Sequence, residues 1–460
     1  MRKFICLLMV QLLLAAESQT VVIKSIPHIK QKPDFCGEAC VAMLMQKLGY
    51  KNVTQDMVFN KSWLSPLEGR GCYTRELKVA IQGLGFKTGK IFHTVKAGSE
   101  QEINEEWLKL YGNLKKGISS IVCMHYNDQP NTTEHFRLIV GYDPKKDEVI
   151  YHEPALAKSP YKRMSLKMFK KLWPLKYDKK KWSLIRFTMD PANVKKQKPD
   201  TGFTNADYAQ EVMRLKKLLP KNFSYVIEKP FLIVGDENSM VVQQRSKRTV
   251  AWATAHLKKS YFAKDPKKLL TIYLFKDKAS YRKYCWKLWR DKPTTPYGYY
   301  SSANNALVMN IATGGGTLVH EMVHPFMEAN FDECPAWFNE GLASLYEQSG
   351  RRNGQIVGFT NWRLKGLKTQ IKGGLMSFKK LLSTSSNQFY GGNNYAQARY
   401  LCYYLQEKKL LRKYYKSFVK NAKKDPSGYD TLVTILGAEG KDMVKFQKAW
   451  ELWISKLVYR

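Results

Sequence analysis

The sequence predicts a two-domain α+β protein, in which a mixed N-terminal domain precedes a mostly helical domain with a small sheet. With 460 residues, the chain is too long for one compact core. Its first half alternates short strand-like runs with one clear helix, whereas helical periodicity dominates from Gly316 onward. Between the halves, Asp190–Thr204 is rich in Lys, Pro and Asp, as linkers are. We therefore expect domains at 21–188 and 204–460, with a linker at 189–203.

The N-terminus has the pattern of a secretory signal peptide. A short basic start precedes the apolar run Phe4–Leu14, and small residues follow at Ala16 and Ser18. The run is too short to cross a bilayer, which takes about 20 apolar residues. We expect residues 1–18 to be removed, no transmembrane segment in the rest of the chain, and a secreted or periplasmic protein.

The expected elements follow in chain order. In the first half we predict a helix near Cys36–Leu48, then strands at Ser119–His125, His135–Tyr142 and Glu148–His152, with a turn at Asp143–Asp147. In the second half we predict helices at Tyr208–Leu219 and Ser246–Phe262, then strands at Leu269–Phe275 and Ala306–Ile311. Helices then dominate to the end of the chain.

The charge is strongly positive throughout. Lys and Arg number 76 against 39 acidic residues, which gives a net charge of +37. Such a surface attracts polyanions, including acidic polymers of a cell envelope, although general solubility and a lineage bias in Lys usage are the preferred explanation. No nucleic-acid-binding signature is present, so we expect no specific nucleic-acid partner.

A candidate metal site begins the helical part of the second half. The run His320-Glu321-Met-Val-His324 is HExxH, and on a helix its two imidazoles lie on one face and can bind one Zn²⁺. The intervening Glu321 can then act as a general base. After a spacer, Glu340 lies in Trp-Phe-Asn-Glu-Gly-Leu-Ala and can supply a third ligand. Three ligands leave one position open, as in catalytic zinc sites.

This combination resembles the gluzincin metallopeptidases over roughly residues 204–460. The resemblance implies His320, His324 and Glu340 as zinc ligands and Glu321 as the general base. It also implies an oxyanion-stabilising tyrosine, for which Tyr395 is our candidate, and makes Ala306–Ile311 the edge strand that pairs with the substrate.

Two features complicate the zinc hypothesis. Pro325 follows His324 directly and removes a helical N–H, so we expect the helix to kink or end there. Glu347 is an alternative third ligand that lacks the surrounding motif. A buried histidine pair without metal is the competing interpretation.

A candidate cysteine site lies in the first half. Seven cysteines remain beyond the predicted signal peptide, so an exported chain has at least one free thiol. Cys36 begins a predicted helix, whose dipole lowers a thiol pKa, and Gln31 upstream can donate to an oxyanion. His135 is the candidate base, and Glu153 the acid that orients it.

The order of these residues resembles the papain-like peptidases that process double-glycine bacteriocin leaders, over about residues 24–170. The resemblance implies Gln31 as oxyanion donor, Cys36 as nucleophile, His135 as base and Glu153 as orienting acid. The family has Asp or Asn before the proline where this chain has Glu153, which puts activity in doubt.

The alternatives for this site are structural. Cys36 and Cys40 could be a buried pair, or one of them could form a disulfide with Cys72 or Cys123. His152 is a weaker candidate base than His135. The remaining histidines in the mature chain are interpreted as structural: His28, His93, His125 and His256.

Together these patterns predict a two-domain peptidase that acts on protein or peptide substrates. Zinc chemistry is expected in the second domain and Cys-His thiol chemistry in the first. The alternative is a binding protein whose degenerate papain-like domain targets an anionic envelope polymer, with only the zinc domain, or neither, catalytic. The oligomeric state is left open.

Overall fold

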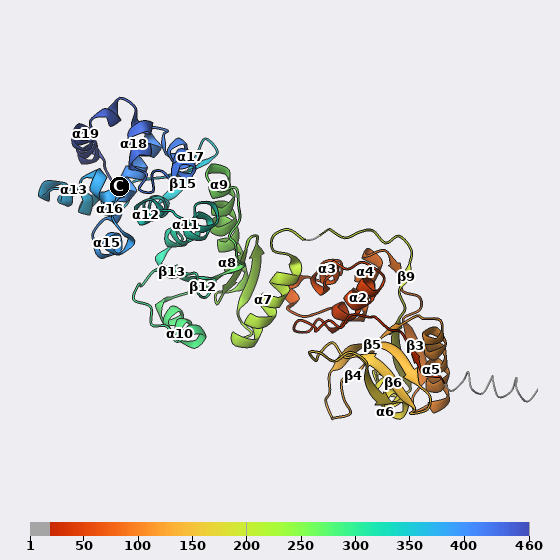
Figure 1. Cartoon of the computed structure of the whole chain (residues 1–460). Helices are drawn as coiled ribbons and strands as arrows, with labels where there is room; N and C mark the ends of the chain where they lie inside the picture. Colours follow the sequence, from red (N-terminus) through yellow and green to blue (C-terminus); the bar gives the residue numbers. More distant parts are fainter. Residues whose placement is uncertain (1–18, 199, 460) are drawn as a thin grey trace, which may run out of the picture. The chain divides into compact units, whose positions relative to one another are not determined.

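The computed structural model describes residues 19–198 and 200–459 (Figure 1). The predicted signal peptide lies outside these residues. The chain forms two compact units, the first ending at Lys217 and the second beginning at Leu218. Within the described residues, no helix combines the length and the apolar character needed to cross a membrane.

The first unit combines short helices with an antiparallel sheet. Its helices are α2 (Cys36–Lys47), α3 (Gln55–Asn60), α4 (Thr74–Gly83), α5 (Glu100–Lys115), α6 (Leu166–Leu172) and α7 (Asn205–Leu218). Its strands are β1 (Val21–Val22), β2 (Phe86–Lys87), β3 (Phe92–Lys96), β4 (Ser120–His125), β5 (Glu134–Asp143), β6 (Glu148–His152), β7 (Lys162–Ser165), β8 (Lys181–Phe187) and β9 (Asp190–Pro191). The helix and the three strands predicted in this half agree with α2, β4, β5 and β6.

The main sheet of this unit has the strand order β3-β8-β4-β5-β6-β7, and β1 pairs with β5. Successive side chains of a strand point to opposite faces of the sheet. On β5, Phe136, Leu138 and Val140 therefore belong to the core under α2, α3 and α4. Ile139 belongs instead to the core under α5 and α6. The sheet is thus covered by helices on both faces.

The boundary between the units differs from the predicted one. Asp190–Pro191 forms β9, which pairs with β2, so the extended linker begins only after it. Helix α7 belongs to the first unit, because Ala206 and Ala209 enter its core and Gln210 Nε2 donates to the carbonyl of Pro33 at 2.9 Å. The second unit consequently begins at Leu218 rather than at residue 204.

The second unit has a small sheet and many helices. Its helices are α8 (Ser239–Arg245), a π-helical turn (Ser246–Ala251), α9 (Trp252–Ser260), α10 (Lys278–Trp289), α11 (Gly316–Asn330), α12 (Ala336–Leu345), α13 (Arg363–Gly373), α14 (Phe378–Leu382), α15 (Ser386–Gly391), α16 (Tyr395–Glu407), α17 (Leu411–Asn421), α18 (Tyr429–Leu436) and α19 (Met443–Lys456). Its strands are β10 (Ser224–Glu228), β11 (Phe231–Gly235), β12 (Leu270–Phe275), β13 (Gly298–Ser301), β14 (Ala306–Asn310), β15 (Ser349–Arg352) and β16 (Gln355–Gly358).

The sheet of this unit has the order β10-β11-β12-β14-β13. Strands β11, β12 and β14 run parallel, whereas β13 is antiparallel to β14. Leu307 and Met309 of β14 pack in the same core as residues of α11 and α12. On the other face, Phe275 of β12 stacks on Tyr284 of α10 with ring centroids 5.4 Å apart.

This order corrects the predicted edge strand. Residues Ala306–Ile311 correspond to β14, which lies between β12 and β13 and therefore has no free edge. The edge strand next to β14 is β13, whose Gly-Tyr-Tyr-Ser sequence is too short to give a periodic signal. The hairpins β10–β11 and β15–β16 were likewise not predicted.

Candidate functional site

Helix α11 presents the HExxH residues. It starts after Gly314, whose positive φ of 105° suits glycine, and it contains His320, Glu321 and His324 on consecutive turns. The helix does not end at His324 as the proline suggested, because it continues through Pro325 to Asn330. Tertiary packing offsets the lost hydrogen bond, since Val323, Pro325 and the following residue are buried.

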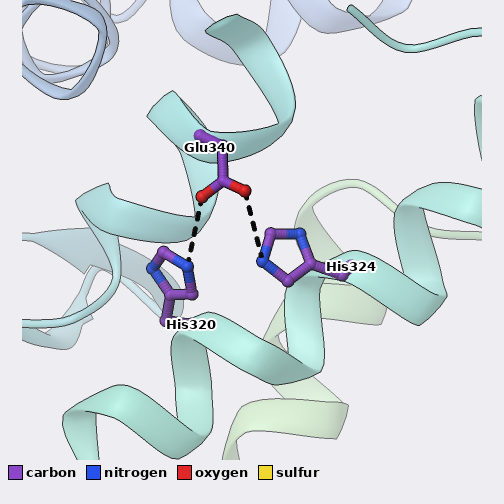
Figure 2. A group of neighbouring side chains, drawn as sticks. All are labelled: His320, His324 and Glu340. Atoms are coloured by element: carbon purple, nitrogen blue, oxygen red, sulfur yellow. Dashed lines mark ion pairs between the residues drawn. The ribbon is translucent and has the colours of Figure 1, made fainter. Parts of the chain in front are cut away.

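Helix α12 supplies the third residue of the group. Glu340 is buried, and Figure 2 shows its carboxylate between the two imidazole rings. Its Oε2 lies 3.3 Å from His320 Nε2, and its Oε1 lies 3.9 Å from His324 Nε2. The potential ligand atoms of these three residues all lie within 4.8 Å of one another. The structure thus brings together the three predicted ligands.

The other ring nitrogens of the two histidines face polar groups that orient them. His324 Nδ1 lies 3.0 Å from Asn339 Oδ1. His320 Nδ1 lies 3.4 Å from Glu347 Oε1, which is long for a hydrogen bond. Glu347 is therefore not grouped with the three ligands but faces the far side of one of them. Such outer partners keep Nε2 directed at a metal.

Glu347 is itself held in place by a buried network. Arg363 donates to it from Nε at 2.9 Å and from Nη2 at 2.6 Å, and Asn361 Nδ2 donates at 3.0 Å. Burial opposes ionisation of Glu347, but Arg363 and His320 lower its pKa to about 2. A permanent negative charge consequently faces His320.

The group has the chemistry of a cation site. Burial alone would lower the pKa of His320, but the carboxylates of Glu340, Glu347 and Glu321 raise it to about 10. One buried oxygen, Glu340 Oε2, has no hydrogen-bond partner among the described residues. Two imidazole nitrogens and one carboxylate match the ligand set that Zn²⁺ takes in open catalytic sites. The residues present therefore fit a zinc ion.

The fourth predicted residue, Glu321, is tied to the edge strand. The backbone N–H of Tyr300 on β13 donates to Glu321 Oε2 at 3.0 Å. A cavity of about 680 Å³ lies beside this carboxylate and is also lined by Gly298 of β13, His320 and Tyr395. The predicted base therefore lies between the candidate ligands and a strand with a free edge.

Two tyrosines lie at the site. The predicted Tyr395 lines the cavity, and its ring is beneath the Arg363 guanidinium at 5.3 Å from the ring centroid. Tyr390, which was not predicted, donates from its hydroxyl to Glu340 Oε1 at 3.1 Å. No local pattern distinguishes Tyr390 from its many tyrosine neighbours, so only its contact with Glu340 identifies it.

The predicted cysteine site has a different character. Cys36 begins α2 and opens into a cavity of about 710 Å³ that is also lined by Cys72, Cys123, Glu134 and Tyr177. Burial and the negative charges of Glu38 and Asp34 raise the pKa of Cys36 to about 12. The expected lowering by the helix dipole is therefore wrong, because desolvation and two nearby carboxylates outweigh it.

The predicted base and acid do form a pair. His135 Nε2 lies 2.5 Å from Glu153 Oε1, and Arg137 Nε donates to Glu153 Oε2 at 2.7 Å. Burial opposes ionisation of Glu153, but these partners lower its pKa to about 2. Glu153, despite its extra methylene, thus reaches the imidazole.

The structure does not bring this pair to the thiol. His135 is opposite Met124 in the register of β4 and β5, and Met124 belongs to the core under α5 and α6. Phe136, the next residue, packs in the other core, which Cys36 contacts. Alternation along β5 therefore directs His135 away from the face on which Cys36 lies. Within the described residues, no hydrogen bond or ion pair joins the two.

The remaining predicted residues of this half have structural contacts. The backbone N–H of Gln31 donates to the carbonyl of Pro154 at 2.8 Å, and its buried Oε1 has no partner among the described residues. Gln31 thus lies at the Glu153 end of β6 and does not line the Cys36 cavity. The seven cysteines of the described chain are free thiols, including Cys40, Cys72 and Cys123.

One known protein family matches part of the first unit. The model of the Peptidase_C39 like family covers residues 23–180, about a third of the chain. This match identifies the N-terminal domain as a papain-like domain of the C39 peptidase type. No match to a curated protein was found.

Proposed function

We propose that the second unit is a zinc-dependent peptidase. The observation that carries the proposal is the convergence of His320 Nε2, His324 Nε2 and the Glu340 carboxylate, with ligand atoms within 4.8 Å of one another. Zinc, when bound there, would act as a Lewis acid that polarises a scissile carbonyl. The proposed substrates are proteins or peptides.

The chain's own residues have distinct roles in this proposal. Glu321 is not among the three ligands, so its carboxylate is free to accept a proton from the attacking water and deliver it to the leaving amine. The N–H of Tyr300 holds that carboxylate at the edge of β13. Tyr395 faces the same cavity and would donate to the developing oxyanion.

The free edge of β13 would hold the substrate. Its backbone groups on the side away from β14 have no neighbouring strand in the five-stranded sheet. An extended peptide could therefore add to this edge, as peptides do to exposed sheet edges. This would place the peptide chain beside Glu321 and Gly298, both of which line the 680 Å³ cavity.

For the first unit, a binding role is favoured over thiol catalysis. The specific observation is that Cys36 and His135 lie toward opposite faces of the sheet, so the predicted base does not face the thiol. The raised pKa of Cys36 keeps it in the less nucleophilic thiol form. We propose that this domain targets an exported peptidase to its site of action.

The test of the zinc proposal uses the full chain. Purified protein should contain about one zinc per chain and cleave members of a peptide library. Glu321→Gln should keep the zinc and lose about 100-fold or more in turnover, because the base is removed but the ligands are not. Glu333→Gln is the matched control, because Glu333 is exposed and lies outside the site. Zinc-free protein, even after reconstitution, would refute the proposal.

A further inference from the structure

A second large cavity lies in the first unit, and it shares no lining residue with the cavities at Cys36 and at Glu321. It has a volume of about 820 Å³ and is formed mainly by the start of α5 and by α6. Its apolar floor includes Ile103, Leu166 and Trp182, which belong to or pack against the core on this face of the sheet. We refer to it as the α5–α6 cavity.

Four lysines surround this floor: Lys167, Lys170, Lys171 and Lys176. Their partners leave much of the positive charge uncompensated. Lys170 Nζ donates to the neutral amide oxygen of Asn104 at 2.7 Å, and Lys176 Nζ lies 4.8 Å from the Trp182 ring centroid. Lys171 pairs with Asp128 at 3.1 Å, but both side chains are solvent-exposed, where such pairs are weak.

The lining also contains groups suited to hydroxyls. Glu100, Gln101 and Asp147 line the same cavity as the lysines. Carboxylates and amides accept hydrogen bonds from sugar hydroxyls, but the carboxylates would repel a dense row of phosphates. The indole of Trp182 is half-buried, and the Lys176 ammonium lies over its ring. Acidic polysaccharides combine the groups that such a lining could bind, because they carry scattered negative charges and many hydroxyls on sugar rings.

We propose that the α5–α6 cavity binds an anionic glycan, whose charge is carried by carboxylate or phosphate substituents. The lysines contact the charged substituents, and Glu100 and Asp147 accept hydrogen bonds from hydroxyls. A single-stranded nucleic acid is the less favoured ligand, because the carboxylates lie among the lysines and the one aromatic ring of the lining already has the Lys176 ammonium over it. The inference gives the binding role proposed for this unit a location and a ligand class.

The experiment measures binding to the full-length protein by calorimetry at low ionic strength. The probes are an oligogalacturonate, a phosphorylated mannan fragment, a neutral maltooligosaccharide of matched length and a single-stranded oligonucleotide. Lys170→Gln combined with Lys176→Gln removes two positive charges from the cavity. Lys445→Gln combined with Lys448→Gln removes the same charge from exposed positions on the second unit and is the matched control.

At least one acidic glycan should bind, and the neutral one should not. The cavity variant should weaken that binding by about tenfold or more, while the control changes it less than about twofold. The carboxylate and phosphate probes distinguish the two kinds of acidic substituent. Added salt should weaken binding, as it does for exposed charges.

Three outcomes would overturn the inference. The first is that neither acidic glycan binds. The second is that the control variant loses as much glycan affinity as the cavity variant. The third is that the oligonucleotide binds more tightly than the glycans and that this binding depends on the cavity lysines. Chelator treatment should leave glycan binding unchanged, because the cavity and the candidate zinc site lie in different units. Failure of the zinc proposal is therefore distinguishable from failure of this one.

Discussion

At the scale of single residues, the candidate zinc site depends on groups that would not touch the metal. Asn339 precedes Glu340 on α12 and reaches back to the ring of His324. Glu347, in the turn that follows the same helix, faces His320. Helix α12 and the turn after it thus supply one ligand and the polar groups that face both histidines, so we expect changes along this segment to alter zinc binding.

The contact of Asn339 with His324 gives the first prediction. Asn339→Ala removes the acceptor facing Nδ1, so the zinc affinity should fall by about 10- to 100-fold. Asn339→Asp keeps an acceptor at that place and should retain most of the affinity. Competition with a chelating dye measures both, without reference to activity. Equal affinities for the Ala variant and the unmodified chain would contradict the orienting role.

The thiol of Cys36 gives the second prediction. Its pKa is raised to about 12 by burial and by Glu38 and Asp34, so the neutral thiol should persist across pH 6–9. Alkylation, followed by mass spectrometry of the peptide that contains Cys36, should be slow at pH 7. Its rate should rise about tenfold per pH unit, because only the thiolate reacts.

Glu38→Gln provides the internal check on this cause. The glutamine keeps an acceptor for the N–H of Cys72, to which Glu38 Oε1 is hydrogen-bonded at 2.7 Å, but removes the negative charge. Alkylation of Cys36 should then become faster at alkaline pH. A rate that is already maximal near pH 6 would mean that a base activates the thiol, which would restore the cysteine-peptidase hypothesis.

At the scale of elements, the start of α11 lies directly against the turn that follows α12. A Cβ on Gly316 would lie 2.0 Å from the carbonyl oxygen of Glu347, closer than any side chain can approach. The neighbouring Gly315 has more room, since the nearest atoms to its Cβ belong to Thr249 at 3.4 Å. The two glycines therefore form a natural pair for comparison.

This close approach predicts different outcomes for two adjacent substitutions. Gly316→Ala should cost about 1–3 kcal/mol of unfolding free energy and weaken zinc binding, because the backbone of Glu347 must move. Gly315→Ala should stay within about 0.5 kcal/mol of the unmodified chain. Urea denaturation measures both. Similar stabilities for the two variants would show that the α11–α12 contact is looser than the structure has it.

At the scale of the whole molecule, the two units have separate cores and separate candidate sites. The residues that would hold zinc all belong to the second unit, so metal should stabilise that unit alone. The extended segment after β9 contributes few buried residues. We therefore expect the units to unfold as independent transitions, as loosely linked domains do.

Calorimetry of the full chain tests this independence. At a free zinc concentration about 1,000 times the Kd, binding contributes about 4 kcal/mol, so a chelator should lower one transition by on the order of 10 °C. His324→Ala should lower the same transition and abolish its response to zinc, whereas Cys36→Ser should leave it unchanged. A single transition that shifts as a whole would indicate one cooperative unit.

Much of the candidate site could be predicted because it depends on local spacing. His320 and His324 are four positions apart in the sequence, and the helical period alone puts them on one face. Glu340 could be predicted as a ligand from the sequence motif that surrounds it. By contrast, Tyr390 and Asn339 carried no signal, because their roles depend on which side chains lie nearby after folding.

The fold divides in the same way. The strands β4, β5, β6, β12 and β14 agree with their predicted ranges, because alternation of apolar residues is a local property. The edge position was wrongly assigned to β14, because strand order is set by pairing between distant segments. Of the two outcomes expected at Pro325, a kink or an end of the helix, the end is wrong, because α11 continues to Asn330 and its packing against neighbouring elements outweighs one missing hydrogen bond.

By itself, the sequence determined several of the helical and strand segments, the two-part organisation and the residue types that could bind zinc or form a thiol site. Only the tertiary structure decided that β13 is the free edge, that α7 belongs to the first unit, and that His135 and Cys36 lie toward opposite faces of the sheet. The physical reason is that helix period and strand alternation arise from neighbours along the chain. Burial, strand order and the electrostatic surroundings of a thiol arise from contacts between residues far apart in it.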